Sequence, residues 1–477
     1  MQQLNRFELK PLNLGPTGDS RPGGRFTFID LFAGIGGFRI ALERLGGQCL
    51  GYSEVDAEAI AVYQKNFISP IGSSEGNLGD VQTIGTLPES VDLIVGGVPC
   101  QPWSIAGKIK GFEDPRGQLW FDVIRIIRLN QPKAFIFENV KGLMEPRHRQ
   151  SLDWIVRELS QLGYFVTFKL LNSYDFGLPQ DRDRIFIVGI QTRIPSYSEF
   201  KFPEPLAEKP RLSDCIEGVE RRVIQKRKFP PEELFGDRIP ASRGRFQKPD
   251  ELNDFFLFSD VRDGHTTIHS WDLLETSERE KEICLTLLRN RRKKIYGPKD
   301  GNPLSFEHLQ GLISDLSREE LEQLVDKRIL RQADPGRYEF VNSKISAGIN
   351  GVAKISLPHA DGIGTLTATG MRDFIGTVSL NCQDPKTYKQ EFIDKIYKPG
   401  RFKPISARDY GRLQGFPEEF QMARREAIAR KQFGNAVSVP VVYHLGRSLL
   451  EVVFGVGIQS PVFWGDGISL SPVQPSL

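Results

Sequence analysis

Apolar positions between residue 26 and about residue 200 alternate between two periodicities. Continuous apolar runs of strand length cover residues 26–32, 91–95, 134–137 and 184–188. Helical spacing covers residues 38–45, 119–129 and 151–162, and the first of these stretches ends at Gly46-Gly47, a typical helix end. Alternating strands and helices predict an α/β fold built on a mostly parallel, doubly wound sheet.

This rhythm stops near Pro205 and returns near Pro404, which divides the chain into parts. We expect a flexible tail over residues 1–24, a catalytic and cofactor-binding domain over 25–205, a second, smaller and irregular domain over 206–400, a return to the first domain over 401–454, and a C-terminal tail over 455–477. Residues 303–342 contain two helical stretches, a turn and a strand, as in part of a winged-helix module. A helical insertion that only packs fits them equally well.

The composition predicts the cellular compartment of the protein but not its binding partner. The 477 residues are 39% hydrophobic and 26% charged, without an apolar run of about 18 residues or a signal-peptide pattern. This composition predicts a soluble protein that stays in the cytoplasm or on the nucleoid and is not membrane-bound. Five scattered cysteines argue against a disulfide framework and a zinc site. His265 and His269 lack a third ligand, so we expect no metal. The net charge of +3 does not indicate whether the protein binds a nucleic acid.

A glycine-rich turn follows the first predicted strand. Gly34, Gly36 and Gly37 allow the backbone to approach a ligand closely, and Glu54, about 20 residues further on, has the position of a ribose-binding carboxylate. This pattern predicts a nucleoside-cofactor site. It leaves NAD, a flavin and S-adenosylmethionine open as ligands, and a purely structural turn also fits.

Three further motifs carry candidate chemistry. Cys100 follows Pro99 directly after a strand, at the sheet edge where open α/β sheets bind ligands, and a turn rich in Gly, Pro, Gln and Ser suits a reactive thiol better than a buried one. Glu138 ends another predicted strand. Arg182 and Arg184 lie at i and i+2, on one face if the chain is extended, where they can bind a phosphate or a base carbonyl. A salt-bridge ladder with the neighbouring aspartates fits them equally.

In this order the motifs resemble those of the bacterial DNA (cytosine-5)-methyltransferases of restriction-modification systems. The matching blocks are DLFAGIGG at 30–37, GGVPCQPWSIAGK at 96–108 with GFEDPRG at 111–117, ENVKG at 138–142, PQDRDR at 179–184, RDYGRLQGFP at 408–417 and QFGNAVSVPV at 432–441. The resemblance covers about residues 26–200 and 400–450. It implies a Rossmann-like S-adenosylmethionine-dependent methyltransferase domain, and a target-recognition domain with a Thr365-Leu366 motif between the matching parts.

The resemblance also implies a covalent mechanism on a flipped cytosine. Cys100 is then the nucleophile at C6, Glu138 binds the N3 and amino edge of the base, and Arg184, with Arg182 beside it, holds the O2 oxygen. For the cofactor, S-adenosylmethionine, the family match gives binding roles to Phe32, Gly34, Ile35, Gly37, Glu54, Val55, Asp80, Pro99, Asn435, Ala436 and Val437. Because Asn435 comes from the far end of the chain, the last helix must fold back onto the first domain.

Duplex DNA is the expected substrate, and the protein is expected to act as a monomer. Expected DNA contacts are Gln101, Ser104 and Lys108 in the loop after the nucleophile, and Arg221, Arg222, Arg291 and Arg292 in two basic clusters of the middle region. A cognate restriction endonuclease is a possible functional partner. An RNA (tRNA) cytosine-5 methyltransferase with the same core is the alternative, and the long middle region favours the DNA enzyme.

Overall fold

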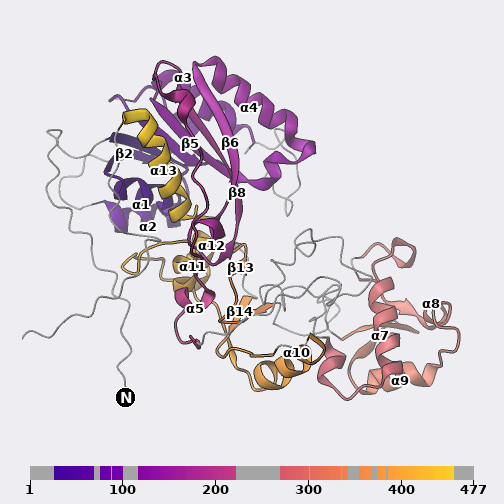
Figure 1. Ribbon diagram of the computed structural model, residues 1–477. Coiled ribbons are helices and arrows are strands. Elements are labelled where there is room, and N and C mark those ends of the chain that lie inside the picture. Colours follow the sequence, from indigo (N-terminus) through magenta and orange to yellow (C-terminus); the bar gives the residue numbers. More distant parts are fainter. Residues whose placement is uncertain are drawn as a thin grey trace, which may run out of the picture. The chain divides into compact units, whose positions relative to one another are not determined.

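The computed structural model describes residues 26–68, 76–87, 89–99, 117–221, 269–299, 301–334, 336–341, 354–367, 373–382 and 385–455 (Figure 1). The chain divides into two compact units. Unit 1 contains residues 1–210, 364–370 and 406–477, and unit 2 contains residues 211–363 and 371–405. Unit 1 is thus assembled from three separate stretches of the chain.

Unit 1 is built on a seven-stranded sheet in the order β3-β2-β1-β4-β5-β8-β6. Its strands are β1 (Phe26–Leu31), β2 (Gly47–Ser53), β3 (Gly76–Asn77), β4 (Leu93–Gly97), β5 (Ala134–Val140), β6 (Tyr164–Asn172) and β8 (Asp183–Gln191). Strands β1 to β5 pair in parallel, whereas β8 pairs antiparallel with both β5 and β6. The predicted doubly wound sheet is confirmed, with β8 as the one reversed strand.

The reversal of β8 decides which residues share an edge of the sheet. Parallel strands bring their carboxyl ends to the same edge, and a reversed strand brings its first residues to that edge instead. The start of β8 therefore lies beside the end of β5, with Arg184 paired to Val140 and Phe186 paired to Glu138. This register places the PQDRDR segment next to ENVKG.

Helices cover both faces of this sheet. The helices of unit 1 are α1 (Gly37–Arg44), α2 (Ala57–Phe67), α3 (Leu119–Asn130), α4 (Arg149–Gln161), α11 (Ala407–Leu413), α12 (Glu426–Asn435) and α13 (Val439–Phe454). Apolar side chains of α3 and α4 join a core with Ile29, Phe135 and Ile187 on one face. Because side chains alternate along a strand, Phe26 faces the other way, and its ring lies 6.2 Å from that of Phe454 in α13.

Short turns of helix and a two-residue strand complete unit 1. They are η1 (Val81–Thr83), η3 (Lys141–Met144), η4 (Pro146–His148), η5 (Ser173–Phe176), η6 (Tyr197–Glu199) and β7 (Gln180–Asp181). The last helix folds back onto the first, as the sequence predicts: a Cβ on Gly446 of α13 would lie 2.9 Å from the side chain of Leu45, directly after α1. The two ends of the matching region thus form one core.

Unit 2 contains two small sheets with helices around them. Its elements are α5 (Leu212–Cys215), η10 (Ser270–Leu273), α7 (Glu278–Asn290), η11 (Lys294–Tyr296), β9 (Leu304–Ser305), α8 (Phe306–Gln310), α9 (Arg318–Asp326), β10 (Leu330–Asp334), β11 (Arg337–Phe340), β12 (Lys354–Ser356), β14 (Asp373–Gly376), α10 (Pro385–Phe392), η12 (Ile393–Tyr397) and β15 (Phe402–Pro404). Strand β13 (Ile363–Gly364) lies at the boundary of the units. The sheet orders are β10-β11-β9 and β12-β14-β15, each with a hydrophobic cluster of its own.

Within the described part of the chain, one helical stretch is long and apolar enough to cross a membrane. It runs over Glu426–Phe454, and 67% of its most apolar window is buried inside the protein. Burial of this kind is the pattern of a core helix, and the packing of α13 against α1 agrees with it.

Candidate active site

Glu138 and Arg184 form an ion pair at the carboxyl edge of the sheet. The Nε atom of Arg184 lies 2.9 Å from Oε1 of Glu138, and both side chains are largely buried, at 16% and 11% exposure. Their Cα atoms are diagonal neighbours in the β5–β8 register, so both side chains leave the sheet on the same face. A carboxylate and a guanidinium are thereby held side by side.

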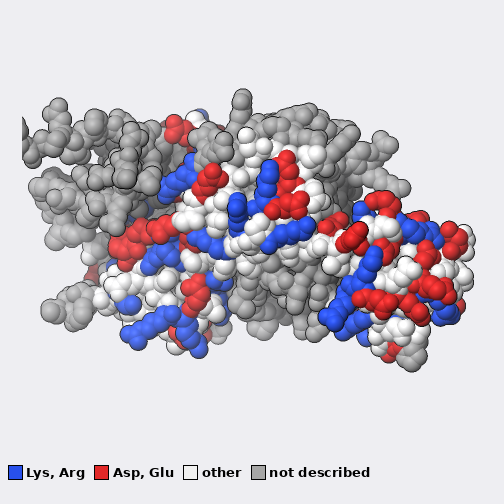
Figure 2. Space-filling view, turned by 90° about the horizontal axis from the view of Figure 1, so that it is seen from below, with Lys and Arg blue, Asp and Glu red and all other residues white. Residues whose placement is uncertain are grey.

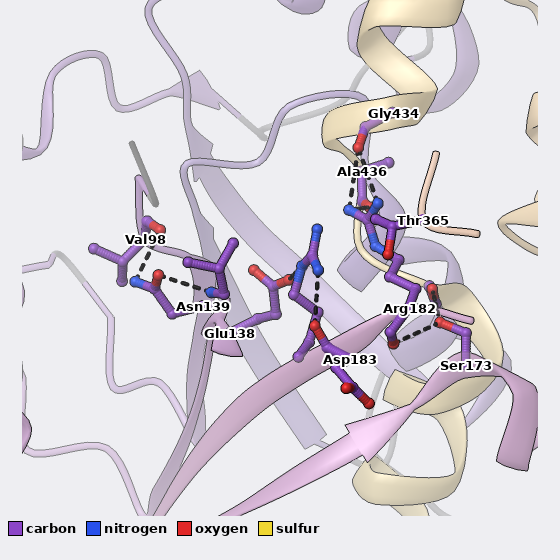
Figure 3. A network of polar contacts seen from close by, with 12 residues as sticks. Val98, Glu138, Asn139, Ser173, Arg182, Asp183, Thr365, Gly434 and Ala436 are labelled. Atoms are coloured by element: carbon purple, nitrogen blue, oxygen red, sulfur yellow. Dashed lines mark hydrogen bonds and ion pairs between the residues drawn. The ribbon is translucent and has the colours of Figure 1, made fainter. Parts of the chain in front are cut away.

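The strand that leads to Cys100 ends directly beside this pair. Gly97, the last residue of β4, pairs with Glu138, and a Cβ on Gly97 would lie 3.7 Å from Oε2 of Glu138. The fully buried Asn139 donates a hydrogen bond to the carbonyl of Val98 at 3.3 Å and accepts one from the N–H of Val140 at 2.8 Å (Figure 3). Asn139 is a positioning residue that the sequence analysis missed. Cys100 itself lies outside the described residues, as do Gln101, Ser104, Lys108 and Arg222.

Arg182 does not lie beside Arg184, which corrects the expectation that the two share a face. Arg182 is 2% exposed, and its guanidinium donates hydrogen bonds of 2.9–3.1 Å to the carbonyls of Leu366, Gly434 and Ala436 (Figure 3). Arg182 falls between β7 and β8, where the chain leaves one strand for the next, so the two-residue repeat of a single strand does not apply. The side chain holds protein carbonyls instead of a base oxygen.

The described side-chain contacts of the acidic neighbours are with Asn172 and Lys141, where the alternative interpretation expects a ladder of salt bridges with the arginines. The carboxylates of Asp181 and Asp183 accept hydrogen bonds from the side-chain amide of Asn172 at 2.7 and 2.9 Å. Asp183 also pairs with Lys141 at 2.9 Å. These contacts fix the turn before β8, and with it the position of Arg184.

Gln180 belongs to the same network and was not singled out by sequence. It is fully buried, its Oε1 accepts a hydrogen bond from the N–H of Leu366 at 3.1 Å, and its Nε2 donates to the carbonyl of Leu413 at 2.7 Å. The hydroxyl of Thr365 donates to the carbonyl of Asp181 at 2.8 Å. The Thr365-Leu366 segment is thus bound to the PQDRDR segment by both backbone and side chains. The only signal in the sequence was the position of Gln180 inside a recognised block.

The glycine-rich turn between β1 and α1, predicted to bind the cofactor, has the left-handed backbone that its glycines allow. Phe32, Gly34 and Gly36 have φ angles of 54°, 56° and 90°. A Cβ on Gly34 would meet nothing within 4 Å, whereas one on Gly36 would lie 2.3 Å from the ring of Phe67 and one on Gly37 2.8 Å from Val437. Gly36 and Gly37 are therefore needed for packing, and Gly34 faces open space that a ligand can fill.

Glu54 organises the rim of this turn. Its Oε2 accepts a hydrogen bond from the N–H of Gly34 and its Oε1 accepts from the N–H groups of Val55 and Asp56, all at 2.8 Å. A carboxylate has about four acceptor positions, so Oε2 keeps capacity for a ribose hydroxyl. Asn77, a second positioning residue missed by sequence, accepts from the N–H groups of Glu54 and Gly79 at 3.2 and 3.0 Å. It ties the Glu54 loop to the loop of Asp80.

The remaining predicted cofactor residues surround the turn in different ways. Val55 is 68% exposed, which is unusual for a large apolar side chain, and Asp80 is exposed at the start of η1. Pro99 is half-buried before Cys100, while the Ile35 side chain is buried. The segment of Asn435, Ala436 and Val437 joins α12 to α13: Asn435 is exposed, and Val437 packs against Gly37.

A buried carboxyl lies beneath the turn. Asp30 is fully buried near the end of β1, and burial raises its pKa well above the usual range, against the attraction of Arg39. Arg39 is itself buried and pairs with Glu43 at 2.7 Å. The charge pattern below the glycine turn is therefore set by Asp30, the first residue of the DLFAGIGG block, together with Arg39 and Glu43, which the sequence analysis did not include.

The residues of the middle region that were predicted to contact DNA differ in how exposed their side chains are. Arg221 and Arg292 are exposed. Arg291 is only 3% exposed, with its guanidinium 5.5 Å from the ring centre of Phe340. The expectation that Arg291 contacts a phosphate is wrong, because its side chain belongs to the core of the surrounding fold.

Comparison with known proteins gives this arrangement a family. The chain matches the C-5 cytosine-specific DNA methylase family over residues 26–451. The type II methyltransferase M.HgiCII of Herpetosiphon aurantiacus is 48% identical over 426 residues, which cover 89% of this chain and 97% of that protein. M.BanI of Aneurinibacillus aneurinilyticus is 34% identical over 459 residues (90% and 96% covered), and M.HpaII of Haemophilus parainfluenzae is 31% identical over 434 residues (90% of each covered).

The match extends over both units and includes each motif block of the glycine turn, the Pro-Cys loop and the Glu138–Arg184 edge. The chain belongs to the C-5 cytosine-specific DNA methylases and is a DNA (cytosine-5)-methyltransferase.

Proposed function

We propose that the enzyme methylates C5 of a flipped cytosine in duplex DNA by covalent catalysis with Cys100. The observation that carries this proposal is the Glu138–Arg184 ion pair of 2.9 Å beside Gly97, because β4 runs directly from Gly97 into Val98-Pro99-Cys100. A thiol, a carboxylate and a guanidinium at one sheet edge are the groups that activation of a pyrimidine ring needs.

The ring chemistry assigns a role to each of these side chains. The Cys100 thiolate forms a bond to C6, and the electron pair of the C5–C6 double bond moves to C5, which then takes the methyl group. Glu138 binds the N3 and amino edge, and Arg184 stabilises the negative charge that develops towards O2. Loss of the C5 proton to a base restores the double bond, and the sulfur–C6 bond breaks. Because C6 is not reachable in a stacked duplex, the cytosine has to leave the helix.

S-adenosylmethionine is the proposed methyl donor, and it supplies an activated methyl group on a sulfonium. The residues around the glycine turn fit it. Gly34 faces open space, Val55 offers an exposed apolar surface to a purine, and Glu54 and Asp80 offer carboxylates to a ribose and an amino group. Phe32 and Pro99 border the same turn and strand end, and the buried Asp30 carboxyl adds an acidic group below it.

The type II methyltransferase relatives support a biological role in a restriction-modification system of the cytoplasm, in which methylation protects host DNA from a cognate endonuclease. The same relatives favour DNA over tRNA as substrate. Incorporation of labelled methyl groups into duplex DNA and into tRNA, measured side by side, tests this choice, and transfer to tRNA alone would contradict it. Bisulfite sequencing of DNA from expressing cells then gives the recognition sequence.

Two cysteine variants test the nucleophile. Cys100→Ser should abolish methylation and keep DNA binding, whereas Cys382→Ser, a half-buried thiol of unit 2, should leave turnover unchanged. Wild-type enzyme should also form a covalent complex with DNA that carries 5-fluorocytosine at the target position, and Cys100→Ser should not. Retained turnover in Cys100→Ser would rule out the covalent mechanism.

A further inference from the structure

We propose that the last residues of α7 and the segment that follows them towards β9, residues 289–299 (the basic loop), contact the phosphate backbone of duplex DNA, and that α9 does not. This inference rests on the proposed function in that it takes the substrate DNA as the partner. The contact surface then lies within unit 2 and differs from α9, the helix that the local fold would suggest as the DNA-binding element.

The basic loop belongs to a module with its own core, residues 269–341. Its order is helix α7, strand β9, helices α8 and α9, and the antiparallel pair β10–β11, with β9 completing the sheet. Fifteen buried residues from Trp271 to Phe340 form its hydrophobic cluster. This is the element order of a winged helix. In such helix-turn-helix folds the second helix of the pair, here α9, ordinarily enters the major groove.

The surface of α9 is unsuited to DNA. Its exposed positions include Glu319, Glu322 and Asp326, whose carboxylates would be repelled by phosphates. The one arginine of this helix, Arg318, is engaged elsewhere: it pairs with Glu307 at 3.0 Å, and its guanidinium lies 4.2 Å from the ring centre of Phe306. A helix with this charge is a poor candidate for groove binding.

The basic loop has the opposite character. Arg289, Arg292, Lys293, Lys294 and Lys299 are all exposed. Neither Lys293 nor Lys294 forms an ion pair with a described residue, while Arg279, Lys281, Arg318, Lys327 and Arg331 of the same module are each paired with a carboxylate. Figure 2 shows Lys and Arg side chains running along one flank of this module, beside a separate group of Asp and Glu. Unpaired lysines are available to phosphates without first breaking an ion pair.

The loop is held in a fixed shape from inside. The side-chain amide of Asn302, 3% exposed, donates to the carbonyls of Arg291, Gly297 and Lys299 at 2.9–3.0 Å, and its oxygen accepts from the N–H of Lys299 at 2.9 Å. A Cβ on Gly301 would lie 2.2 Å from the Arg291 guanidinium. Arg291 thus closes the core while its neighbours face outward. A preorganised cluster loses less entropy on binding a polyanion than a flexible one does.

Salt-dependent binding tests this surface. The dissociation constant of the full-length enzyme for a duplex oligonucleotide is measured between low and physiological salt for wild type, for Lys293→Gln/Lys294→Gln, and for the matched control Lys395→Gln/Lys398→Gln. The control removes the same charge from exposed lysines that are paired with Glu391 and Asp394. A third variant, Glu319→Gln/Glu322→Gln, reports on α9. Melting temperatures check that each variant is folded.

We expect the loop variant to bind at least about tenfold more weakly at low salt, with a log–log salt slope reduced by about 2, since each phosphate contact contributes about 0.9. The control and the α9 variant should keep the wild-type slope. An unchanged slope in the loop variant overturns the inference, and so does a several-fold gain of affinity in the α9 variant. Both outcomes leave the proposed function intact, because methylation of the same duplex by wild type is measured separately.

Discussion

Arg184 meets Glu138 across the β5–β8 junction with 2.9 Å between Nε and Oε1, and this contact exists because β8 runs against the rest of the sheet. The first residues of a reversed strand and the last residues of a parallel one share an edge. A carboxylate from one motif and a guanidinium from another are thereby fixed in a single polar pair.

Arg184→Lys should therefore reduce turnover without unfolding the enzyme. Lysine keeps the charge but lacks the planar fork that can contact Glu138 and a base oxygen together. We expect kcat on duplex DNA to fall about 100-fold or more, the range for loss of one group that stabilises developing charge. Steady-state kinetics and a thermal melt check this, and a variant with full kcat would remove Arg184 from the proposed mechanism.

Arg182→Met should act on stability instead. Its guanidinium holds the carbonyls of Leu366, Gly434 and Ala436 in a buried site, and methionine leaves all three without this donor. The free energy of unfolding should fall by about 3 kcal/mol, the scale for breaking a buried charged contact. Urea denaturation gives the value. Equal stability in Arg182→Met and wild type would show that the three carbonyls find other donors.

Gly34→Ala and Gly36→Ala should separate ligand binding from packing. A Cβ on Gly34 projects into open space, although alanine at its φ of 56° costs about 1 kcal/mol of backbone strain. We therefore expect a folded protein with affinity for S-adenosylmethionine reduced about tenfold or more. A Cβ on Gly36 would lie 2.3 Å from the ring of Phe67 at a φ of 90°, so overpacking should lower stability by about 2 kcal/mol. Calorimetric titration and thermal melts distinguish the two effects. Equal behaviour of the variants would contradict this division.

His444 should make the fold sensitive to acid. Its burial, with a smaller effect from Arg447, lowers the pKa of His444 from 6.5 to about 4. The unfolded chain then binds a proton below pH 6.5 that the folded chain takes up only near pH 4, so stability is present above pH 6.5 and falls between these values. The loss amounts to at most about 3 kcal/mol at the acid end.

The matched variant for this effect is His444→Phe, since the neighbouring Phe176 ring lies 5.7 Å from that of His444 and a phenyl group suits the site. Urea denaturation at pH 7 and at pH 4.5 should show a smaller difference in unfolding free energy for His444→Phe than for wild type. The same difference in both proteins would place the acid sensitivity elsewhere.

Much of the fold of unit 1 follows from local pattern. The helices from Gly37, Leu119 and Arg149 and the strand from Ala134 have clear apolar patterns, and the sequence predicts each of them. Strand β2 (Gly47–Ser53) is predicted only indirectly, as the strand that should end at the acidic residue Glu54, because two glycines and several polar residues weaken its own apolar pattern and its place is decided by pairing with β1. The direction of β8 is likewise a property of the assembled sheet.

The sequence predicts those parts of the site whose function depends on a single residue type at a single position of a motif. Arg182 and Arg291 show the limit. Both stand in exposed-looking basic segments, yet one is buried against the Gly434 and Ala436 carbonyls and the other near Phe340. Their partners are distant in sequence, so no local pattern distinguishes an inward arginine from an outward one. Asn77 and Asn139 were missed for the same reason, because each side chain hydrogen-bonds to backbone groups of other loops.

The short segment 364–370 has a consequence for exchanging sequence specificity between relatives. It interrupts unit 2 in the chain but belongs to unit 1, where Thr365 and Leu366 are bound to the segment of Gln180 and Asp181. A chimaera that replaces residues 211–405 as one block would therefore exchange part of the catalytic framework as well. Grafts of 211–363 and 371–405 that retain the host's Thr365 and Leu366 leave these contacts within unit 1 intact. We predict that such grafts change the DNA sequence that is methylated while turnover is retained.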